Sequence, residues 1–406
     1  MRKTGTDTKS RKLINENKNF FEWFIWKLTL KTLFLSTKKK NMKKILFMMV
    51  CMLSVVGQAQ AQDEKAERVK QIRQAYAKAK EKIAQNGKNG KAPRDMLITL
   101  TDELSDGSDM ESEQHLEFYF DFVEHKDEDG ATFTSRQPFF VIDNWNAVGH
   151  STESEHLFNL ADGKLMFCFN KTETDGGYIM EQRYYYDQQG RLVERKGRQG
   201  MEGQKLTEDL NEDHNNAELM ERWGHIYQDI FNRIAGRVQY GEEIVNGNGK
   251  ATPKTERMKF IRSTYAKAKE KISLNEKSEA PRLLKIVHHD ELENDGRPIK
   301  TEYNFYFDSN EGDYHCYFIS MHRTYMGFDC YVEYLFSPQS HDLIFSYTSS
   351  KEEGNHWEWR YYLDENGQCI EQKTTADMDD AMDEGYEDRQ EAQNLIKVFN
   401  ALANPF

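Results

Sequence analysis

The stretch Ala-Lys-Ala-Lys-Glu-Lys-Ile at residues 77–83 recurs without change at residues 266–272. The match extends upstream, where Glu67, Arg68, Ile72, Arg73 and Tyr76 recur as Glu256, Arg257, Ile261, Arg262 and Tyr265. An offset of 189 residues is too long for a solenoid repeat and suits a duplicated domain.

Each copy of this stretch is predicted to be an amphipathic helix. Large apolar residues fall at Val69, Ile72, Tyr76 and Ile83 in the first copy, with lysines and glutamates between them. This three-then-four spacing places the apolar side chains on one face of a helix, and Ala, Lys and Glu favour helix. We therefore interpret the lysines as a solvated face rather than as a nucleic-acid or membrane-binding element.

Short strand-like runs and turn signals follow each predicted helix. In the first copy the runs are 96–100, 115–123, 139–145, 156–160, 165–170 and 179–186, continued by 191–196 after a turn at 187–190. In the second copy the runs are 283–288, 301–308, 314–320, 330–336, 343–348 and 357–363, continued by 368–373. Consecutive strands without intervening helices predict an antiparallel meander.

A second predicted helix closes each copy, at residues 217–234 and 387–402. The expected fold is therefore α+β, with two tandem homologous modules. Each module has an N-terminal helix, an antiparallel meander of about six to seven strands and a C-terminal helix. The predicted bounds are 62–237 for module 1, 238–253 for a Gly- and Asn-rich linker and 254–406 for module 2.

Residues 42–61 have the pattern of a secretory signal peptide. Met42-Lys43-Lys44 is followed by an apolar run over 45–56 and an Ala-x-Ala sequence that predicts cleavage after Ala61. The run is too short for a comfortable membrane span. We expect export to the periplasm or the extracellular space, with no stable membrane span in the mature chain. Residues 1–41 are then expected to be a mis-assigned start or a disordered extension, a membrane-seeking N-terminus being the alternative.

The charge of the chain argues against two kinds of partner. The formal net charge is −13, and removal of the first 61 residues, with 13 Lys and Arg against 3 Asp and Glu, leaves −23. Such a chain repels nucleic acid and anionic lipid surfaces. We expect neither as a partner, and the sequence does not predict an oligomeric state.

Four cysteines follow the predicted cleavage site, namely Cys168, Cys316, Cys330 and Cys369. Disulfides are chemically permitted in an exported protein. None of the four recurs in the other copy, so a disulfide is no part of the shared framework. Cys316 with Cys330 is the pair that neighbouring strands could bring together, and free buried thiols are the alternative.

The polar pattern that is best kept between the copies lies on the sixth predicted strand. Glu181-x-Arg183 and the turn from Asp187 to Gly190 match Glu358-x-Arg360 and the turn from 364 to 367. A carboxylate beside an arginine indicates either a ligand clamp or a salt-bridged solvent face. The Asp and Gly are typical of a hairpin turn.

Aromatic residues Trp357, Trp359 and Tyr361 share one face of the predicted strand at 357–363. They could stack on a sugar ring or a peptide, or they could belong to the core. With Glu181, Arg183, Glu358 and Arg360 they are our candidate ligand-binding residues, and the candidate ligand is a glycan or a peptide.

Several polar clusters were weighed as metal or catalytic sites. They are His288-His289-Asp290, His315-Cys316 with His322, the pairs Asp102-Glu103 and Asp290-Glu291, and Asp209-x-Asn211-x-Asp213. The histidines lack ligand spacing for structural zinc, adjacent carboxylates on a strand diverge, and His214 stands where a calcium loop needs glycine. We therefore predict no metal, no cofactor and no catalytic residue.

Two functions remain as hypotheses. The first is a non-catalytic binding or structural protein of the cell envelope or secreted space, built from a duplicated module. The alternative is an exported hydrolase with a site in one module only, drawn from the unshared histidines and carboxylates.

Overall fold

The computed structural model describes residues 64–103, 111–126, 130, 132–147, 149–209, 211, 216–235, 252–278, 281–291, 296–310, 313–352, 354–375 and 386–404. The chain divides into two compact units, residues 1–67 and 68–406. The predicted signal peptide, the segment 1–41 and most of the predicted linker lie outside the described residues. Within the described part, no helix is both long and apolar enough to cross a membrane.

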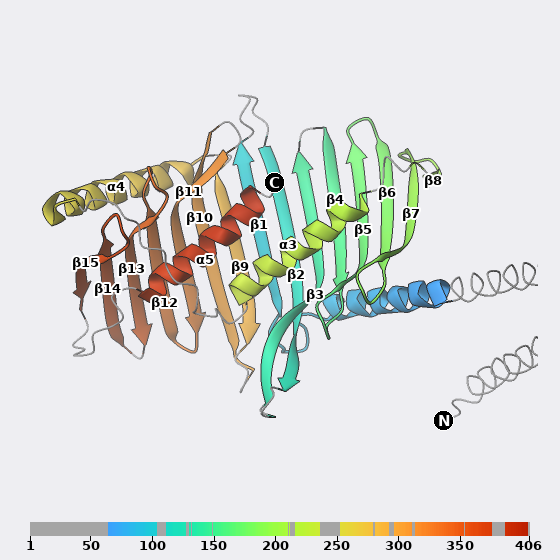
Figure 1. Ribbon diagram of the computed structural model, residues 1–406, viewed down its shortest axis with the longest axis horizontal. Helices are drawn as coiled ribbons and strands as arrows, with labels where there is room; N and C mark the ends of the chain where they lie inside the picture. The colour runs from blue at the N-terminus through green and yellow to red at the C-terminus, as the bar shows by residue number, and fades with distance from the viewer. Residues whose placement is uncertain are drawn as a thin grey trace, which may run out of the picture. The chain divides into compact units, whose positions relative to one another are not determined.

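The second unit is built on one continuous antiparallel sheet of 15 strands, in the order β15-β14-β13-β12-β11-β10-β9-β1-β2-β3-β4-β5-β6-β7-β8 (Figure 1). The first eight strands are β1 (Asp95–Glu103), β2 (Glu111–Lys126), β3 (Thr132–Ala147), β4 (His150–Phe158), β5 (Leu165–Thr174), β6 (Tyr178–Tyr186), β7 (Leu192–Met201) and β8 (Thr207–Asp209). The remaining seven are β9 (Leu283–Glu291), β10 (Pro298–Asn310), β11 (Asp313–Tyr325), β12 (Phe328–Phe336), β13 (Leu343–Glu352), β14 (Asn355–Leu363) and β15 (Cys369–Thr374).

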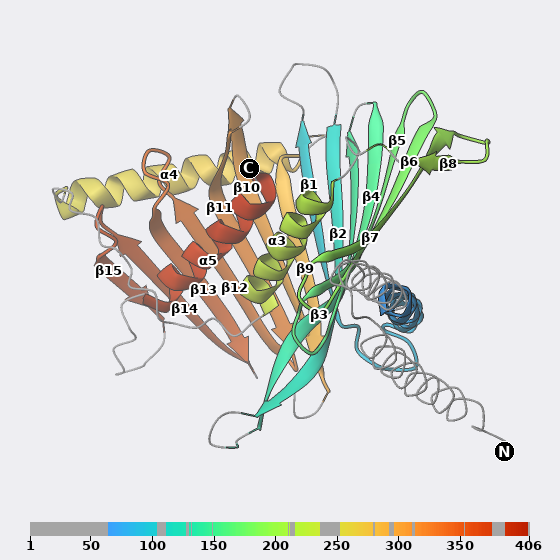
Figure 2. The same cartoon turned by 45° about the vertical axis from the view of Figure 1, so that its right-hand side comes forward.

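Four helices are described, and they cover both faces of the sheet. Helix α3 (Ala217–Ala235) and α5 (Tyr386–Ala403) share one face and contact each other. The helix at residues 64–84, here called helix 64–84, and α4 (Lys254–Asn275) lie on the other face. Figure 2 shows α3 and α5 crossing in front of the strands and α4 running behind them, with helix 64–84 (blue) to the right of the strands.

The α+β class and the antiparallel sheet are confirmed. All the predicted strands and helices are present, and the structure adds the three-residue β8. What the sequence did not predict is that the strands of both predicted modules form a single sheet. Strand β1 pairs with β9 in antiparallel register, with Ile98 opposite Ile286.

The hydrophobic cores of the two faces differ in extent. On the α3/α5 face, one core runs across both halves of the sheet and includes Phe118 and Phe231 as well as Phe305 and Phe399. On the other face, helix 64–84 covers a core of its own around Ile72, and α4 covers a separate one. The hydrophobic core is therefore continuous across the two halves on the α3/α5 face and divided into two on the other face.

The predicted hairpin turn is present in both halves. Asp187 Oδ1 accepts hydrogen bonds from the backbone N–H groups of Gln189 and Arg191 at 2.8 and 2.9 Å. The loop closes on Gly190, whose φ of 83° suits glycine. Asp364 and Gly367 repeat this arrangement with the same bonds. The interpretation of these residues as turn chemistry is confirmed.

The cysteine pair that was singled out does not meet. Cys316 on β11 lies opposite Phe307, whereas Cys330 on β12 lies opposite Arg323, seven residues further along β11. A rise of about 3.3 Å per residue places the two thiols roughly 20 Å apart along the strands. All four described cysteines are free thiols.

A buried polar group lies beneath α3. His156 has no exposed surface; its Nε2 lies 3.5 Å from Cys168 Sγ and its ring packs edge-on against Tyr227. Burial lowers the pKa of His156 to about 4 and raises the pKa of Cys168. Neither group is suited to nucleophilic chemistry near neutral pH, and the corresponding place on β12 holds Tyr334.

This histidine is expected to make folding sensitive to acid. Because its pKa is lower in the folded chain than in the unfolded chain, stability is complete above the unfolded value near 6.5 and is lost as pH falls toward 4. We predict that replacing His156 with Phe removes about 2 kcal/mol of the loss between about pH 7.5 and about pH 5. Urea unfolding at each pH measures this.

The control is His225→Phe, the same substitution at an exposed position of α3. It should leave the pH dependence of wild type unchanged. Equal pH dependence in wild type and His156→Phe would contradict the prediction.

Candidate functional site

A buried carboxylate holds helix 64–84 on the sheet. Glu155 of β4 is only 4% exposed, and it accepts hydrogen bonds from the Tyr76 hydroxyl and from Lys80 Nζ, the latter at 2.7 Å. A carboxylate buried to this extent requires such partners. Burial and the bond to Glu155 raise the pKa of Tyr76, so the hydroxyl remains a donor.

The same arrangement holds α4 on the other half of the sheet. Glu333 of β12 is 3% exposed and accepts bonds from Tyr265 at 2.6 Å and Lys269 at 3.0 Å. Helix 64–84 and α4 therefore use their tyrosine and one lysine for the same task. The sequence predicted a solvated face for all the shared lysines, but Lys80 and Lys269 bind buried glutamates.

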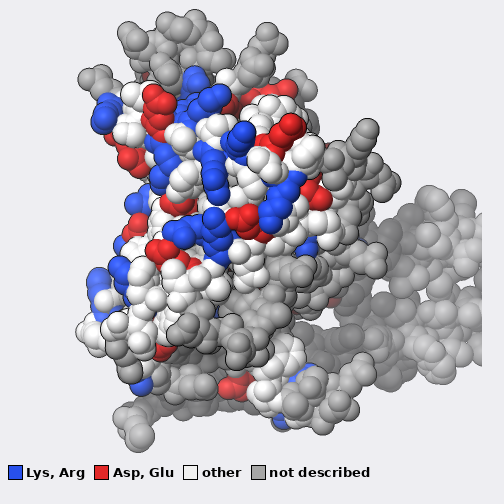
Figure 3. Space-filling model, turned by 90° about the vertical axis from the view of Figure 1, so that its left-hand side faces the viewer, with Lys and Arg blue, Asp and Glu red and all other residues white. Residues whose placement is uncertain are grey.

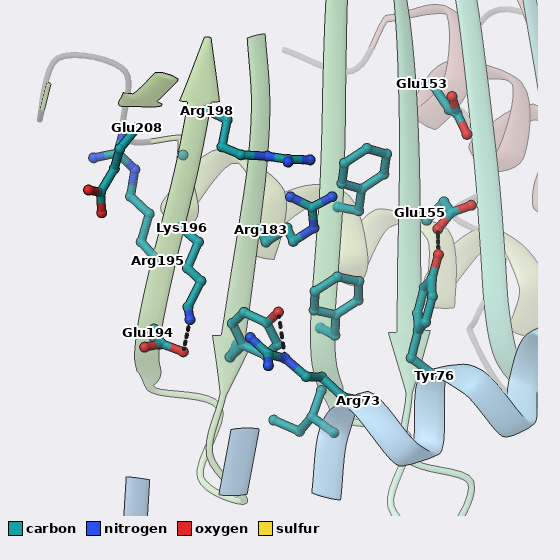
Figure 4. A pocket seen from close by; sticks show the side chains of 15 residues that line it. Arg73, Tyr76, Glu153, Glu155, Arg183, Glu194, Arg195, Lys196, Arg198 and Glu208 are labelled. Atoms are coloured by element: carbon teal, nitrogen blue, oxygen red, sulfur yellow. Dashed lines mark hydrogen bonds and ion pairs between the residues drawn. The ribbon is translucent and has the colours of Figure 1, made fainter. Parts of the chain in front are cut away.

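A cavity of about 1030 Å³, here called the first groove, opens between helix 64–84 and strands β4–β7. Ile72, Arg73 and Tyr76 line it from the helix. From the sheet it is lined by Glu153, Glu155, Phe167, Phe169, Arg183, Tyr185, Glu194, Arg195, Lys196, Gly197 and Arg198, together with Glu208. Figure 4 shows Arg183 and Arg198 pointing into it from neighbouring strands and Arg73 facing them from the helix.

Strand register places these side chains in two cross-strand rows. The row nearer the helix is Leu157, Phe167, Tyr185 and Glu194; the next, here called the charged row, is Glu155, Phe169, Arg183 and Lys196. Residues directly opposite on neighbouring strands have side chains in contact range. The charged row therefore runs from a buried carboxylate at β4 to a lysine at β7.

Two guanidinium groups of the first groove are held against aromatic rings. Arg73 lies 5.6 Å from the ring centre of Tyr185 and donates to its hydroxyl at 3.4 Å. Arg183 lies 5.1 Å from the ring centre of Phe169. Cation–π contacts of this kind restrict where the guanidinium plane can lie. The apolar floor thus serves mainly to position two cations.

The cations of the first groove also have carboxylate neighbours. Glu181 accepts bonds from Arg183, at 3.2 Å, and from Arg198, while Lys196 lies 3.6 Å from Glu194. The side chains of Arg183, Lys196 and Arg198 are 30%, 47% and 49% exposed. Ion pairs this exposed are weak, so an incoming anion could compete for the cations.

A smaller cavity of about 400 Å³, here called the second groove, lies between α4 and strands β13 and β14. Its lining residues are Ile261, Arg262, Tyr265, Phe345, Tyr347, Arg360 and Tyr362. The two cross-strand rows recur there. The first is Leu335, Phe345, Tyr362 and Glu371, and the charged row is Glu333, Tyr347, Arg360 and Lys373.

The structure divides the seven candidate ligand-binding residues between the two faces of the sheet. Arg183 lines the first groove, Arg360 lines the second, and Glu181 and Glu358 pair with them. Tyr361 is 5% exposed and belongs to the core under α5, and Trp359 packs against that core. Trp357 precedes them on the same face of β14. The aromatic candidates are thus separated from the charged ones.

The histidines of the rival hypothesis line neither groove. His288 is buried, His289 contacts Asp95 at 2.7 Å and His315 stacks on His341. Asp209, considered for calcium, is buried and accepts bonds from Gln182 and Arg195, and Asp213 lies outside the described residues. No group of three or more His, Cys, Asp or Glu in the described residues is placed to hold a metal ion.

Sequence reasoning missed the two buried glutamates and the part that the repeated helix plays in the grooves. A signal for the glutamates was available. Glu155-x-Leu157-Phe158 recurs as Glu333-x-Leu335-Phe336. The predicted strand 330–336 includes Glu333, but its counterpart in the first copy, 156–160, begins one residue after Glu155. Arg73 and Tyr76 were recognised as repeated, and only the tertiary structure reveals that they face strands β4–β7.

Comparisons of this chain with models of protein families, with curated proteins and with solved structures found no match.

We predict that Glu155→Gln destabilises the fold by about 1–3 kcal/mol, because the hydrogen bonds from Tyr76 and Lys80 then end on a neutral amide instead of a buried carboxylate. Urea unfolding at neutral pH measures the change. Glu153→Gln, two residues earlier on β4 and less buried, is the matched control and should change stability by less than about 0.5 kcal/mol. The prediction fails if the two variants are equally stable.

Proposed function

We propose that this chain is an exported, non-catalytic binding protein whose first groove takes a small ligand bearing an oxyanion, either a carboxylate or a sulfate. The observation that supports this best is the set of cations lining one cavity. Three arginines and a lysine that face the space, Arg73, Arg183, Lys196 and Arg198, line a cavity of about 1030 Å³ that is also lined by Arg195 and by Glu153, Glu155, Glu194 and Glu208. The chain as a whole has a formal net charge of −13.

The residue types favour an oxyanion. Arginine presents a planar fork of donors that matches the two oxygens of a carboxylate or sulfate. Arg73 and Arg183 approach the groove from the helix and from the sheet, and each rests on a ring. Because the guanidinium positions are set before binding, less conformational entropy is lost on complex formation.

Carboxylates in and beside the groove already pair with its cations, and a bound anion would have to replace some of these ion pairs. Glu155 is already bound by Tyr76 and Lys80, so it does not oppose an anion as a free charge. Glu181 and Glu194 hold Arg183, Arg198 and Lys196 through exposed contacts. A small anion can displace such contacts, whereas a neutral sugar or peptide gains little from them.

We further propose that the two halves of the sheet arose by duplication of one helix–meander–helix module. The repeated sequence supports this, and so do the matching contacts: Arg68 Nε donates to Tyr186 O as Arg257 Nε does to Leu363 O. Where the halves meet, Ile98 lies opposite Ile286, and these residues also correspond in the repeat. Equivalent residues meeting at one antiparallel pair are what a local two-fold axis produces.

Export is the part of the proposal that rests on the sequence alone. The basic residues at 43 and 44, the apolar run at 45–56 and Ala59-x-Ala61 support a cleaved signal peptide and a periplasmic or extracellular location. The hydrolase alternative receives less support, since His288 is buried and His289, His315 and His322 line neither groove.

The first groove can be tested with sulfate and glucuronate as probes and glucose as the neutral control. We expect both anions, at constant ionic strength, to shift the side-chain Nε–H NMR signals of Arg73 and Arg183. Arg183→Met should weaken the response of Arg73 about tenfold or more, since a hydrogen bond to a charged group contributes about 1.5–3 kcal/mol.

The matched control is Arg233→Met on α3, which removes the same charge from the opposite face and breaks a similar exposed ion pair. It should leave binding unchanged. If neither anion moves the Arg73 and Arg183 signals, or if Arg233→Met weakens binding as much as Arg183→Met, the proposed function is wrong.

A further inference from the structure

The second groove repeats the recognition elements of the first on the other half of the sheet. Each of its seven lining residues has a counterpart in the first groove, six of them identical and one, Tyr347, standing for Phe169. The edge that bears α4 and β15 carries Lys and Arg side chains among carboxylates (Figure 3).

The cations of the second groove are held in the same way. Arg360 lies 5.0 Å from the ring centre of Tyr347 and is paired with Glu358 at 2.6 Å. Next to the lining residues, Lys373 of the charged row lies 3.1 Å from Glu371, as Lys196 lies beside Glu194. Arg262 stands on α4 where Arg73 stands on helix 64–84. The side chains of Arg360 and Lys373 are 37% and 47% exposed, so packing of α4 does not require them.

The opposite face of the same strands holds both changed and retained residues. Three corresponding pairs differ in kind: His156 and Tyr334, Cys168 and Ser346, Gln182 and Trp359. Other buried pairs are identical, among them Tyr184 with Tyr361 and Phe158 with Phe336. Burial in the core can account for the retained residues of that face, whereas Arg183 and Arg360 recur although their side chains are 30% and 37% exposed, which favours a binding role for them.

The two grooves differ at the row beyond the charged one. Arg198 lies opposite Glu181 in the first groove. In the second, Thr375 stands beside Glu358: its backbone N–H donates to the Glu358 carbonyl at 3.1 Å, and its hydroxyl accepts from the Glu358 backbone N–H at 2.9 Å. The second groove thus lacks the outermost cation of the first. Its volume is about 400 Å³ against about 1030 Å³, which suits a single anionic group.

We propose that the second groove is a second site for the same class of oxyanion ligand, limited to one anionic group, whereas the first groove can take a ligand with two. This inference rests on the function proposed above for the first groove. Each chain then binds two ligands at grooves of different capacity.

The test follows each site separately in the full mature chain by the side-chain Nε–H NMR signals of its own arginines. With sulfate as the probe, we expect the signals of Arg360 and Arg262 to shift as well as those of Arg183 and Arg73. Arg360→Met should weaken the response of Arg262 about tenfold or more and leave that of Arg183 within about twofold. Arg360→Lys, which keeps the charge but loses the fork, should retain part of the response.

A diuronate disaccharide tests the difference in capacity. At the first groove it should bind about tenfold more tightly than glucuronate. At the second groove the disaccharide and glucuronate should bind with about equal affinity. Thermal unfolding of each variant verifies that the fold is retained.

The outcomes separate this inference from the one on which it rests. If the signals of Arg183 and Arg73 shift and those of Arg360 and Arg262 do not, the second site is overturned and the first remains. If none of the four arginine signals shifts, both sites are overturned. Shifts at Arg360 and Arg262 alone would sustain the second site and remove the first.

Discussion

The carboxylate buried beneath each N-terminal helix is the interaction on which the groove face depends. Glu155 and Glu333 sit on interior strands of their halves, and each takes a tyrosine hydroxyl and a lysine from the helix above. A buried charge with fixed partners tolerates little displacement. It therefore sets the position of the helix over strands β4 and β12. The grooves open beside each helix, over strands β4–β7 in one half and over β13 and β14 in the other.

The two faces of the sheet meet different demands. On the α3/α5 face, one core extends over both halves, and the two helices touch each other. The polar contacts under the two helices differ: the His156 ring packs against Tyr227, while the Tyr334 hydroxyl donates to Glu391. On the groove face, each helix covers its own core, and the contacts of Glu155 and Glu333 are alike in the two halves.

Most elements of this fold could be predicted from the sequence because their signals are local. Alternation along β9 and the three-four spacing in α3 depend on neighbours within a few residues. Strand β8 has no apolar alternation and escaped detection. Pairing of β1 with β9 joins strands far apart in the chain, and no local period encodes it. The charged pair Glu181-Arg183 was found through repetition. Its aromatic neighbours on β5 became part of the site only through cross-strand register.

An acidic chain with arginines in its grooves has a physical consequence for the size of its ligands. At physiological ionic strength the repulsive field of the acidic surface decays over about 8 Å, while the hydrogen bonds of an arginine fork form only at contact. A polyanion that approaches the surface is repelled by the acidic residues along its whole length, while only one of its segments can contact the arginines of the groove. A small anion meets the same repulsion once and gains the full contact with Arg73 and Arg183. On the function proposed above, this charge distribution would favour small oxyanions over nucleic acid and anionic membranes, and the cations of each groove would determine how many charges such a ligand can carry.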